Sequence, residues 1–223
     1  AALSANGGVM LEGDIEHTNG GTITLGLQSQ SQWHGATTAM GALAVTDLSR
    51  WTLTGNSRVD TLTLDNSEIV FPASTLGAFA TLTVAGDFYA RDATIVMNPA
   101  VAGDAAAADR LHILGDARGD AQVRVINAGG AGQATVDGIR LIEVDNVSDA
   151  VFRLSGRAVA GPYEYFLFQG GITDPNDGDW YLRSVRNGQV VPPDPPVGTP
   201  PIDPPSPPID PPSPPIAPPS LPI

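Results

Sequence analysis

A short motif, two apolar residues flanking one other residue, recurs along the first half of this chain at nearly even steps. It is found at Ile23-Thr24-Leu25, Leu43-Ala44-Val45, Leu62-Thr63-Leu64 and Leu82-Thr83-Val84. A second motif, Ser-x-Trp, occurs at Ser31-Gln32-Trp33 and recurs after a similar interval at Ser49-Arg50-Trp51. A fixed period near twenty with alternating apolar positions is typical of an all-β solenoid. Because one repeat cannot bury its own apolar face, we expect the repeats to stack as coils around a shared core, filled by Leu25, Val45, Leu64, Val84 and their equivalents.

The charge and composition of the chain argue against several classes of protein. The formal net charge is −13 and there is no lysine, which is unlike a surface that binds nucleic acid or anionic lipid. There is no cysteine, and hence neither a disulfide framework nor a thiolate metal site. No apolar stretch approaches the ~20 residues of a membrane helix. The chain starts at Ala1 without a signal-peptide pattern, so we expect a mature product or a fragment.

Proline content divides the chain into two parts. Seventeen of the 21 prolines lie between Pro192 and Pro222, where Pro-Pro-Ile-Asp-Pro-Pro-Ser occurs at 200–206 and again at 207–213. Proline at this density is incompatible with a helix or a sheet interior and holds a chain in polyproline II. We therefore expect a solenoid in residues 1–190 and an extended proline-rich linker in residues 191–223.

Residues 100–190 have the features of the end of a solenoid. The segment 99–109 is expected to be an inserted loop or short helical turn, and strands are predicted at 111–114, 122–126, 139–144 and 151–154, with 115–120 as the turn between the first two. Residues 163–169 and 180–185 are predicted to form a β-hairpin around a long polar loop. Seven of the thirteen aromatic residues lie between Phe152 and Tyr181. Since a solenoid needs a cap over its open core, we assign a folding cap to Tyr163, Tyr165, Leu167, Trp180 and Leu182.

The order of these parts resembles the passenger domain of a pertactin-like autotransporter. The resemblance is carried by Leu53-Thr54-Gly55-Asn56-Ser57 through Leu62-Thr63-Leu64-Asp65-Asn66-Ser67, and by Gly161-Pro162-Tyr163-Glu164-Tyr165-Phe166-Leu167 followed by Trp180-Tyr181-Leu182. The second group is similar to the family's autochaperone region. The resemblance implies a right-handed parallel β-helix secreted by the type V route through a C-terminal β-barrel, which this sequence does not contain. It also implies that the last coils fold first, outside the cell, and template the rest.

One short binding motif occurs at Arg118-Gly119-Asp120, where the sequence predicts an exposed turn. Pertactin-like proteins can carry this tripeptide, and it could present both charges to a host-cell receptor of the integrin type. The alternative is that these are ordinary turn residues, and we favour it because a three-residue match has a high false-positive rate.

Other candidate sites have simpler structural explanations. The loop from Asp174 to Asp179 hints at calcium, but its glycine stands one position early for an EF-hand and no glutamate follows, so a hairpin loop is favoured. Trp33 and Trp51 could stack sugars, but stacking in the core is favoured. Three histidines, His17, His34 and His112, lie in different coils without a nucleophile motif. No metal, cofactor or catalytic residue is therefore expected.

The sequence leaves three functional hypotheses. The favoured one is a surface-exposed stem and folding nucleus of a bacterial adhesin or virulence factor, monomeric, at the outer membrane or released after cleavage. The second is a β-helical enzyme that binds or degrades polysaccharide, but a lyase would need a basic residue beside clustered acids, and Arg50 and Arg58 lack such a cluster. The third, a phage tail fibre, is disfavoured by the proline-rich segment.

Overall fold

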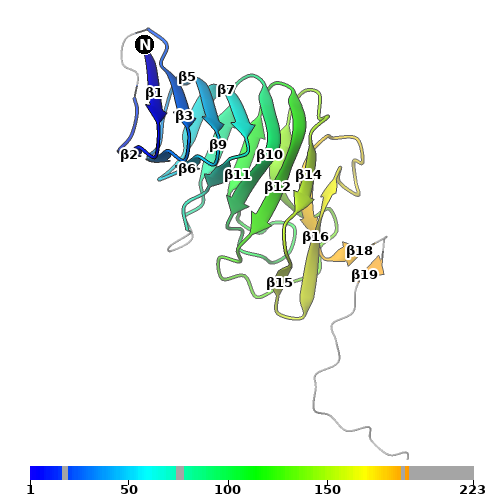
Figure 1. Cartoon of the computed structure of the whole chain (residues 1–223). Helices are drawn as coiled ribbons and strands as arrows, with labels where there is room; N and C mark the ends of the chain where they lie inside the picture. Colours follow the sequence, from blue (N-terminus) through cyan, green and yellow to red (C-terminus); the bar gives the residue numbers. More distant parts are fainter. Residues whose placement is uncertain (17–19, 74–77, 187–188, 191–223) are drawn as a thin grey trace, which may run out of the picture. The chain divides into compact units, whose positions relative to one another are not determined.

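The computed structural model describes residues 1–16, 20–73, 78–186 and 189–190 of the chain. Every regular element in these residues is a β-strand, and most strands pair in parallel with the equivalent strand of the next coil. The result is a parallel β-helix, in which Figure 1 shows the coils stacked from β1 in blue to β14 in yellow-green. No helix long and apolar enough to cross a membrane occurs in the described residues.

The coils of the β-helix have three faces, each a ladder of parallel strands. The first face contains β1 (Ala2–Asn6), β3 (Thr24–Gln28), the second halves of β5 (Met40–Thr46) and β7 (Ser57–Asp65), and the first halves of β10 (Phe88–Met97) and β12 (Ala117–Val125). The second face contains β2 (Met10–Glu12), β4 (Gln32–His34), β6 (Arg50–Thr52), β8 (Glu68–Val70), the second halves of β10 and β12, and β14 (Val151–Leu154). The third face contains the starts of β5 and β7, then β9 (Thr81–Val84), β11 (Arg110–Ile113) and β13 (Ile139–Val144).

The core lies inside this stack and is filled by side chains at alternate strand positions. On the first face Leu25, Leu43, Leu62 and Phe88 are register partners in successive coils, and each is at most 2% exposed. On the second face Trp33 and Trp51 stack with ring centroids 4.8 Å apart and planes 4° apart, which is about the spacing of neighbouring strands. Both tryptophans are buried, so the core interpretation holds and they offer no sugar platform.

The indole groups of this stack are satisfied by glycine carbonyl groups. Trp33 Nε1 donates to the Gly13 carbonyl and Trp51 Nε1 to the Gly35 carbonyl, each at 2.9 Å. A Cβ atom at Gly35 would lie 2.1 Å from the Gly13 carbonyl oxygen, so only glycine allows the two coils to approach here.

The predicted phase of the repeat is wrong at both ends. Leu43 and Leu62 are partners as expected, but Leu25 rather than Ile23 aligns with Leu43, and Phe88 rather than Leu82 aligns with Leu62. Leu82 lies on the third face, opposite Ser57 and Leu111. The step from Leu62 to Phe88 is therefore longer than the two steps before it on the first face. An apolar-x-apolar motif is the same on every face, so it does not reveal which face a strand belongs to once a coil grows longer.

The last strands leave the parallel pattern and form a cap. β15 (Ala158–Ala160), β16 (Tyr163–Gln169) and β17 (Trp180–Arg183) pair antiparallel in that order, and β17 also pairs antiparallel with β13. A short antiparallel pair, β18 (Val185–Arg186) with β19 (Gln189–Val190), follows. The predicted hairpin is confirmed, but its second strand ends at Arg183 rather than at residue 185, because Val185 belongs to β18. The inserted segment 99–109 is a loop, with one hydrogen-bonded turn in which the N–H of Ala106 donates to the Gly103 carbonyl oxygen at 2.9 Å.

The turn predicted at residues 115–120 is wrong. β11 and β12 are not a hairpin, because β11 pairs with β9 and β13 on the third face and β12 with β10 and β14 on the first and second. The chain turns at residues 114–116, and Arg118, Gly119 and Asp120 lie within β12. The predicted linker, residues 191–223, lies outside the described residues.

Candidate functional site

Aromatic side chains at the C-terminal end of the core connect the cap to the coils. Phe152 on β14 contacts Phe88 at 5.9 Å between ring centroids, and Trp180 on β17 meets Phe152 edge-on at 5.3 Å and 78°. Trp180 is 6% exposed and Leu182 fully buried. Such edge-to-face pairs add to the stabilisation from burial alone. The end of the core is thus covered by side chains from β17.

Tyr165 on β16 joins the cap to two loops of the preceding coils. Its side chain is fully buried, and its hydroxyl accepts the N–H of Gln133 at 2.8 Å. The same hydroxyl lies 2.7 Å from the Gln133 carbonyl oxygen and 3.2 Å from that of Ala102. Burial raises the pKa of Tyr165, which keeps the hydroxyl protonated and able to donate.

The other members of the predicted cap are partly exposed. Tyr163 and Leu167 are half-buried and pack against the core, and Leu167 pairs across the hairpin with Leu182. The five residues therefore come from β16 and β17 and meet the core along one side of the hairpin.

A polar cluster around Asp179 was missed from the sequence, where this residue was placed in the hairpin loop. Asp179 is 5% exposed; one of its carboxylate oxygens accepts the N–H of Val144 at 2.9 Å and the other accepts Arg140 Nη1 at 3.0 Å. Burial lowers the pKa of Arg140, but the hydrogen bond to Asp179 and the charge of Glu143 outweigh it, and the net pKa is raised. Asp179 thus ties the cap hairpin to β13. No local signal pointed to it, because its partners lie 35 and 39 residues away.

The remaining carboxylates of the 174–179 loop also act as hydrogen-bond acceptors. Asp174 accepts the N–H of Asn176 at 3.1 Å, and Asp177 accepts the N–H of Asp179 at 2.9 Å. The hydroxyl of Tyr181 donates to Asp177 at 2.7 Å. Burial, followed by this hydrogen bond, raises the pKa of Tyr181. These contacts fit the hairpin-loop interpretation of the segment.

A second missed contact joins two loops of neighbouring coils. Asp104, in the inserted loop, accepts backbone N–H groups from Val136, Asp137 and Gly138 at distances of 2.9 to 3.3 Å. Asp137 in turn accepts the N–H of Thr173 at 2.6 Å and its hydroxyl at 2.8 Å, which lowers the pKa of Asp137. The inserted loop, the 127–138 loop and the cap hairpin are linked in series by these two carboxylates.

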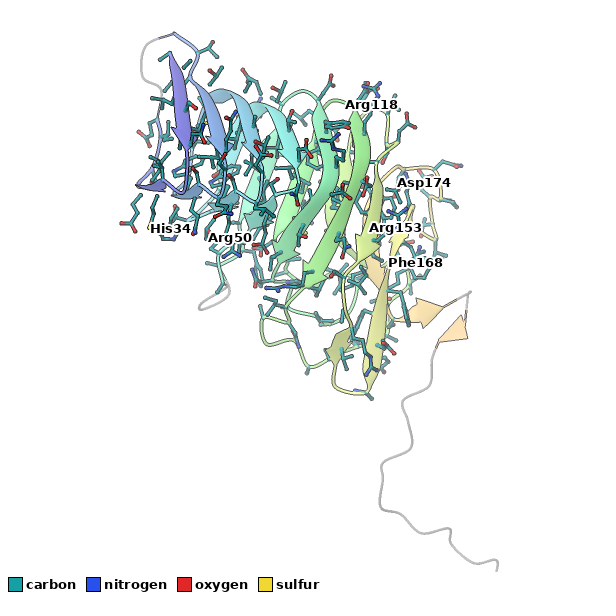
Figure 2. All side chains as sticks on the ribbon, in the orientation of Figure 1. His34, Arg50, Arg118, Arg153, Phe168 and Asp174 are labelled. Atoms are coloured by element: carbon teal, nitrogen blue, oxygen red, sulfur yellow. The ribbon has the colours of Figure 1, made fainter. Side chains whose placement is uncertain are left out.

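The tripeptide Arg118-Gly119-Asp120 has a structural role within β12. Figure 2 shows Arg118 at the outer surface, near the start of this strand. Arg118 donates to Asp116 at 2.6 Å. Gly119 has φ +91°, and a Cβ atom there would lie 1.8 Å from the Ala90 carbonyl oxygen. It faces a β-bulge in which Asp92 is the extra residue of β10.

The two arginines considered as lyase bases lie on different faces. Arg50 on β6 forms an ion pair with Glu68 on β8, its register partner, at 2.5 Å. An ion-paired guanidinium is a protonated cation and cannot serve as a base. Arg58 is exposed on β7 beside Thr83, without an ion pair among the described residues.

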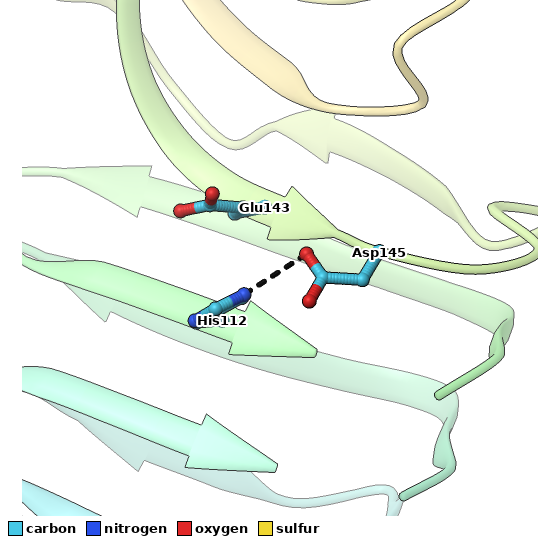
Figure 3. Close-up of side chains that lie close together, drawn as sticks. All are labelled: His112, Glu143 and Asp145. Carbon is cyan, nitrogen blue, oxygen red and sulfur yellow. Dashed lines mark hydrogen bonds and ion pairs between the residues drawn. The ribbon is translucent and has the colours of Figure 1, made fainter. Parts of the chain in front are cut away.

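One group of metal-ligating side chains occurs in the described residues, on the outer surface of the third face. His112 on β11 and Glu143 on β13 are register partners, and Asp145 follows β13 directly. His112 Nε2 lies 3.0 Å from Asp145 Oδ1 (Figure 3), and one ligand atom from each of the three residues lies within 4.8 Å of the others. His34, by contrast, lies on β4 beside Glu12, with no third ligand among the described residues.

The sequence of this chain is similar to those of known autotransporters. A family profile described as Autochaperone Domain Type 1 matches residues 57–167. The adhesin BmaC autotransporter of Brucella suis is 38% identical over 125 residues, which cover 52% of this chain and 4% of the relative. The autotransporter adhesin AIDA-I of Escherichia coli is 36% identical over 104 residues, 47% of this chain and 8% of the relative.

The pertactin autotransporter of Bordetella bronchiseptica is 32% identical over 177 residues, which cover 77% of this chain and 18% of the relative. The chain thus spans less than a fifth of the length of each of these three relatives. The parallel β-helix, the antiparallel cap and the autochaperone match agree with one another. We conclude that the chain belongs to the autotransporter passengers, as the C-terminal, autochaperone-bearing region of a passenger.

Proposed function

We propose that this chain is the stem and folding nucleus of a surface-exposed passenger, and that the whole passenger is an adhesin and virulence factor. Passengers of this family act at the outer-membrane surface, in proteins that also carry a translocator domain. The observation that carries the folding role is the change from parallel to antiparallel pairing at β15 to β17. There the core ends under Trp180 and Leu182 rather than at an open coil.

The coils depend on this end because each buries its apolar face only against its neighbours. In such an array stability is a sum of nearest-neighbour terms, and folding spreads from the most stable unit. The last coils have long-range polar links as well as apolar ones, through Tyr165, Asp104 and Asp179. We therefore propose that the residues of the cap fold first and that the coils add to them in order, toward the N-terminus.

The enzymatic alternative has less support. Two adjoining surface grooves, of about 300 and 520 Å³, follow the corner between the first and second faces and share Leu48 and Asn66. The charged residues of the first groove are Arg50, Glu68 and Asp92. Arg50 forms an ion pair with Glu68, so it is not available as the base of a lyase. We propose that this region has no catalytic activity, that it is monomeric, and that any contact with a host receptor is made by the wider passenger.

The folding role can be tested by surface display of the full-length protein. Trp180→Ala removes a cap side chain, and Leu25→Ala removes a core side chain of an early coil, which is 2% exposed. The tryptophan change should cost about 3–5 kcal/mol of stability and the leucine change about 2–5 kcal/mol. We expect display, scored by protease accessibility on intact cells, to fall much further for Trp180→Ala. Equal losses would mean that the cap is only another piece of core.

The adhesin part of the proposal has its own test. Bacteria that display the full-length passenger should attach to host cells better than bacteria lacking it. Display without any gain in attachment would contradict the adhesin assignment and leave the folding role intact.

A further inference from the structure

The His112–Glu143–Asp145 cluster is not used by the folding function proposed above, and its chemistry is distinctive. It combines one imidazole with two carboxylates: His112 and Glu143 are register partners on neighbouring strands, and Asp145 directly follows β13. We propose that His112, Glu143 and Asp145 bind Zn²⁺ at the surface of the autochaperone region. This inference is independent of the proposed stem and adhesin functions.

The distances suit a small transition-metal ion after one side chain moves. Zn²⁺ binds nitrogen and oxygen ligands at about 2.0–2.2 Å, so tetrahedral ligand atoms lie roughly 3.3–3.5 Å apart. The separation of His112 Nε2 and Asp145 Oδ1, 3.0 Å, is already close to this value. The Glu143 oxygen lies no more than 4.8 Å from the other two ligand atoms. To reach the tetrahedral separation it must move by at most about 1.5 Å, which its flexible side chain allows. Water can fill the fourth position, because all three side chains are at least 22% exposed.

Neighbouring arginines hold the Glu143 carboxylate while leaving it accessible. Arg140 Nη1 lies 3.2 Å from one of its oxygens, and Arg110 Nη1 lies 3.7 Å from the other. Carboxylates that bind metals are commonly held by partners outside the ligand set, and these two ion pairs can act in that way. Arg140 also has Asp179 as a partner at 3.0 Å, so it keeps a counter-ion when Glu143 turns toward the metal.

The ligand set favours zinc over calcium or magnesium. Ca²⁺ and Mg²⁺ prefer oxygen ligands alone, whereas imidazole together with carboxylates suits zinc and its neighbours among the transition metals. The nearest comparison within the chain, His34 beside Glu12, offers only two ligands among the described residues. A bound ion would connect β11 to β13 across one coil step, and it should therefore stabilise the autochaperone region.

Calorimetric titration of the tag-free chain with ZnCl₂, over about 1 µM to 1 mM, tests the proposal. We expect one saturable Zn²⁺ site, no comparable CaCl₂ signal, and an affinity weakened more than about tenfold in His112→Ala and in Asp145→Asn. The matched control is His34→Ala, which should bind Zn²⁺ as tightly as the parent does. A second control is the double variant His17→Ala/His34→Ala, which keeps His112 as its only histidine and should bind Zn²⁺ equally well. Zinc should raise the thermal midpoint of the parent and the controls but not of His112→Ala.

Two results would overturn the proposal. One is a parent chain that binds Zn²⁺ no more tightly than His112→Ala does. The other is a loss in His34→Ala as large as that in His112→Ala, which would indicate diffuse binding to surface groups. If His112→Ala fails to fold, Asp145→Asn decides the question, because Asp145 is about half exposed and lies beyond the end of β13.

Discussion

At the scale of single residues, the most informative side chains are polar groups inside an apolar stack. Asp109 is fully buried and accepts N–H groups from Ala80 at 2.9 Å and Asn98 at 2.8 Å, with Asn98 Nδ2 at 3.0 Å. Asn98 Nδ2 in turn reaches the Phe71 and Pro72 carbonyl oxygens. These contacts hold three successive coils at one corner, where backbone groups would otherwise be buried without partners.

Replacing the Tyr165 hydroxyl isolates its contribution. Tyr165→Phe keeps the ring but leaves the Gln133 and Ala102 backbone groups without their partner. We expect a loss of about 1–3 kcal/mol in the free energy of unfolding, measured by urea denaturation. Tyr163→Phe is the matched control: no hydrogen bond to its hydroxyl is found in the described residues, and its change should stay within about 0.5 kcal/mol. Equal effects would contradict the role assigned to Tyr165.

The buried Asp109 gives a pH dependence of unusual sign. Burial raises its pKa in the folded chain above the ordinary 3.8, so between these two values the folded state binds more protons than the unfolded state. The contribution of Asp109 to stability therefore rises as pH falls through this window and is lowest above it. As pH is lowered from 6 to 3, the free energy of unfolding of the parent should therefore rise relative to that of Asp109→Asn. Urea unfolding at each pH measures this difference.

Asp137 is the control of opposite sign. Its hydrogen bonds to Thr173 lower its folded-state pKa, so its contribution is present above the unfolded pKa and is lost as pH falls through the folded one. The advantage of the parent over Asp137→Asn should shrink over the same range. The free energy of unfolding of the parent relative to Asp109→Asn should instead grow as pH falls. If this difference shrinks or stays constant, the pKa of Asp109 is not raised by burial as described.

The tripeptide in β12 allows stability and attachment to be separated. Gly119→Ala should lower the free energy of unfolding by more than about 2 kcal/mol. Its positive φ strains any residue that has a Cβ atom, and the Ala90 carbonyl oxygen occupies the place of that atom. Arg118→Ala removes only an exposed ion pair and should cost less than about 1 kcal/mol. We expect attachment of displaying cells to be unchanged in Arg118→Ala. Attachment lost at an unchanged thermal midpoint would instead establish Arg118-Gly119-Asp120 as a receptor site.

At the scale of elements, the sequence predicted strands better than their partners. The bounds of β13, β14 and β16 agree with the predicted 139–144, 151–154 and 163–169, because alternation of apolar residues is a local property. The partner of a strand depends on coil length, which grows along the chain, so that the step from Phe88 to Ala117 is much longer than the step from Leu25 to Leu43. The prediction therefore aligned Leu82 with Leu62, where the structure has Phe88. Asp104 and Asp179 were missed for a related reason, since the backbone groups that they bind lie far away in the sequence.

Folding kinetics can show whether the cap element is formed early. Leu182 in the cap and Leu43 in an early coil are both at most 1% exposed, so Leu→Ala removes the same group from comparable surroundings. Each change should cost about 2–5 kcal/mol at equilibrium. If the cap nucleates folding, Leu182→Ala slows refolding from urea, whereas Leu43→Ala mainly accelerates unfolding. The reverse pattern would place the nucleus among the early coils.

At the scale of the whole molecule, the described residues divide into coils that repeat and a cap that does not. The coils present rows of partners along each face, for example Gln32, Arg50 and Glu68 on the second face. Such an array can grow or shrink by whole coils, while the antiparallel cap can be built only once. The match of the autochaperone family to residues 57–167 covers coils as well as cap strands. We infer that the coils on which the cap rests belong to the autochaperone region and are the first to add to the cap.

The proline-rich segment should contribute little to the stability of this whole. Residues 192–223 hold seventeen prolines and few large apolar side chains, too few to offset the entropy of ordering a chain of that length. Deleting 192–223 should therefore leave the thermal midpoint of the β-helix nearly unchanged, as followed by circular dichroism at the strand signal. A chain with a scrambled 192–223 of the same composition is the control for solubility. A fall of many degrees on deletion, restored only by the native order of residues, would mean that the segment packs on the β-helix and is not a spacer.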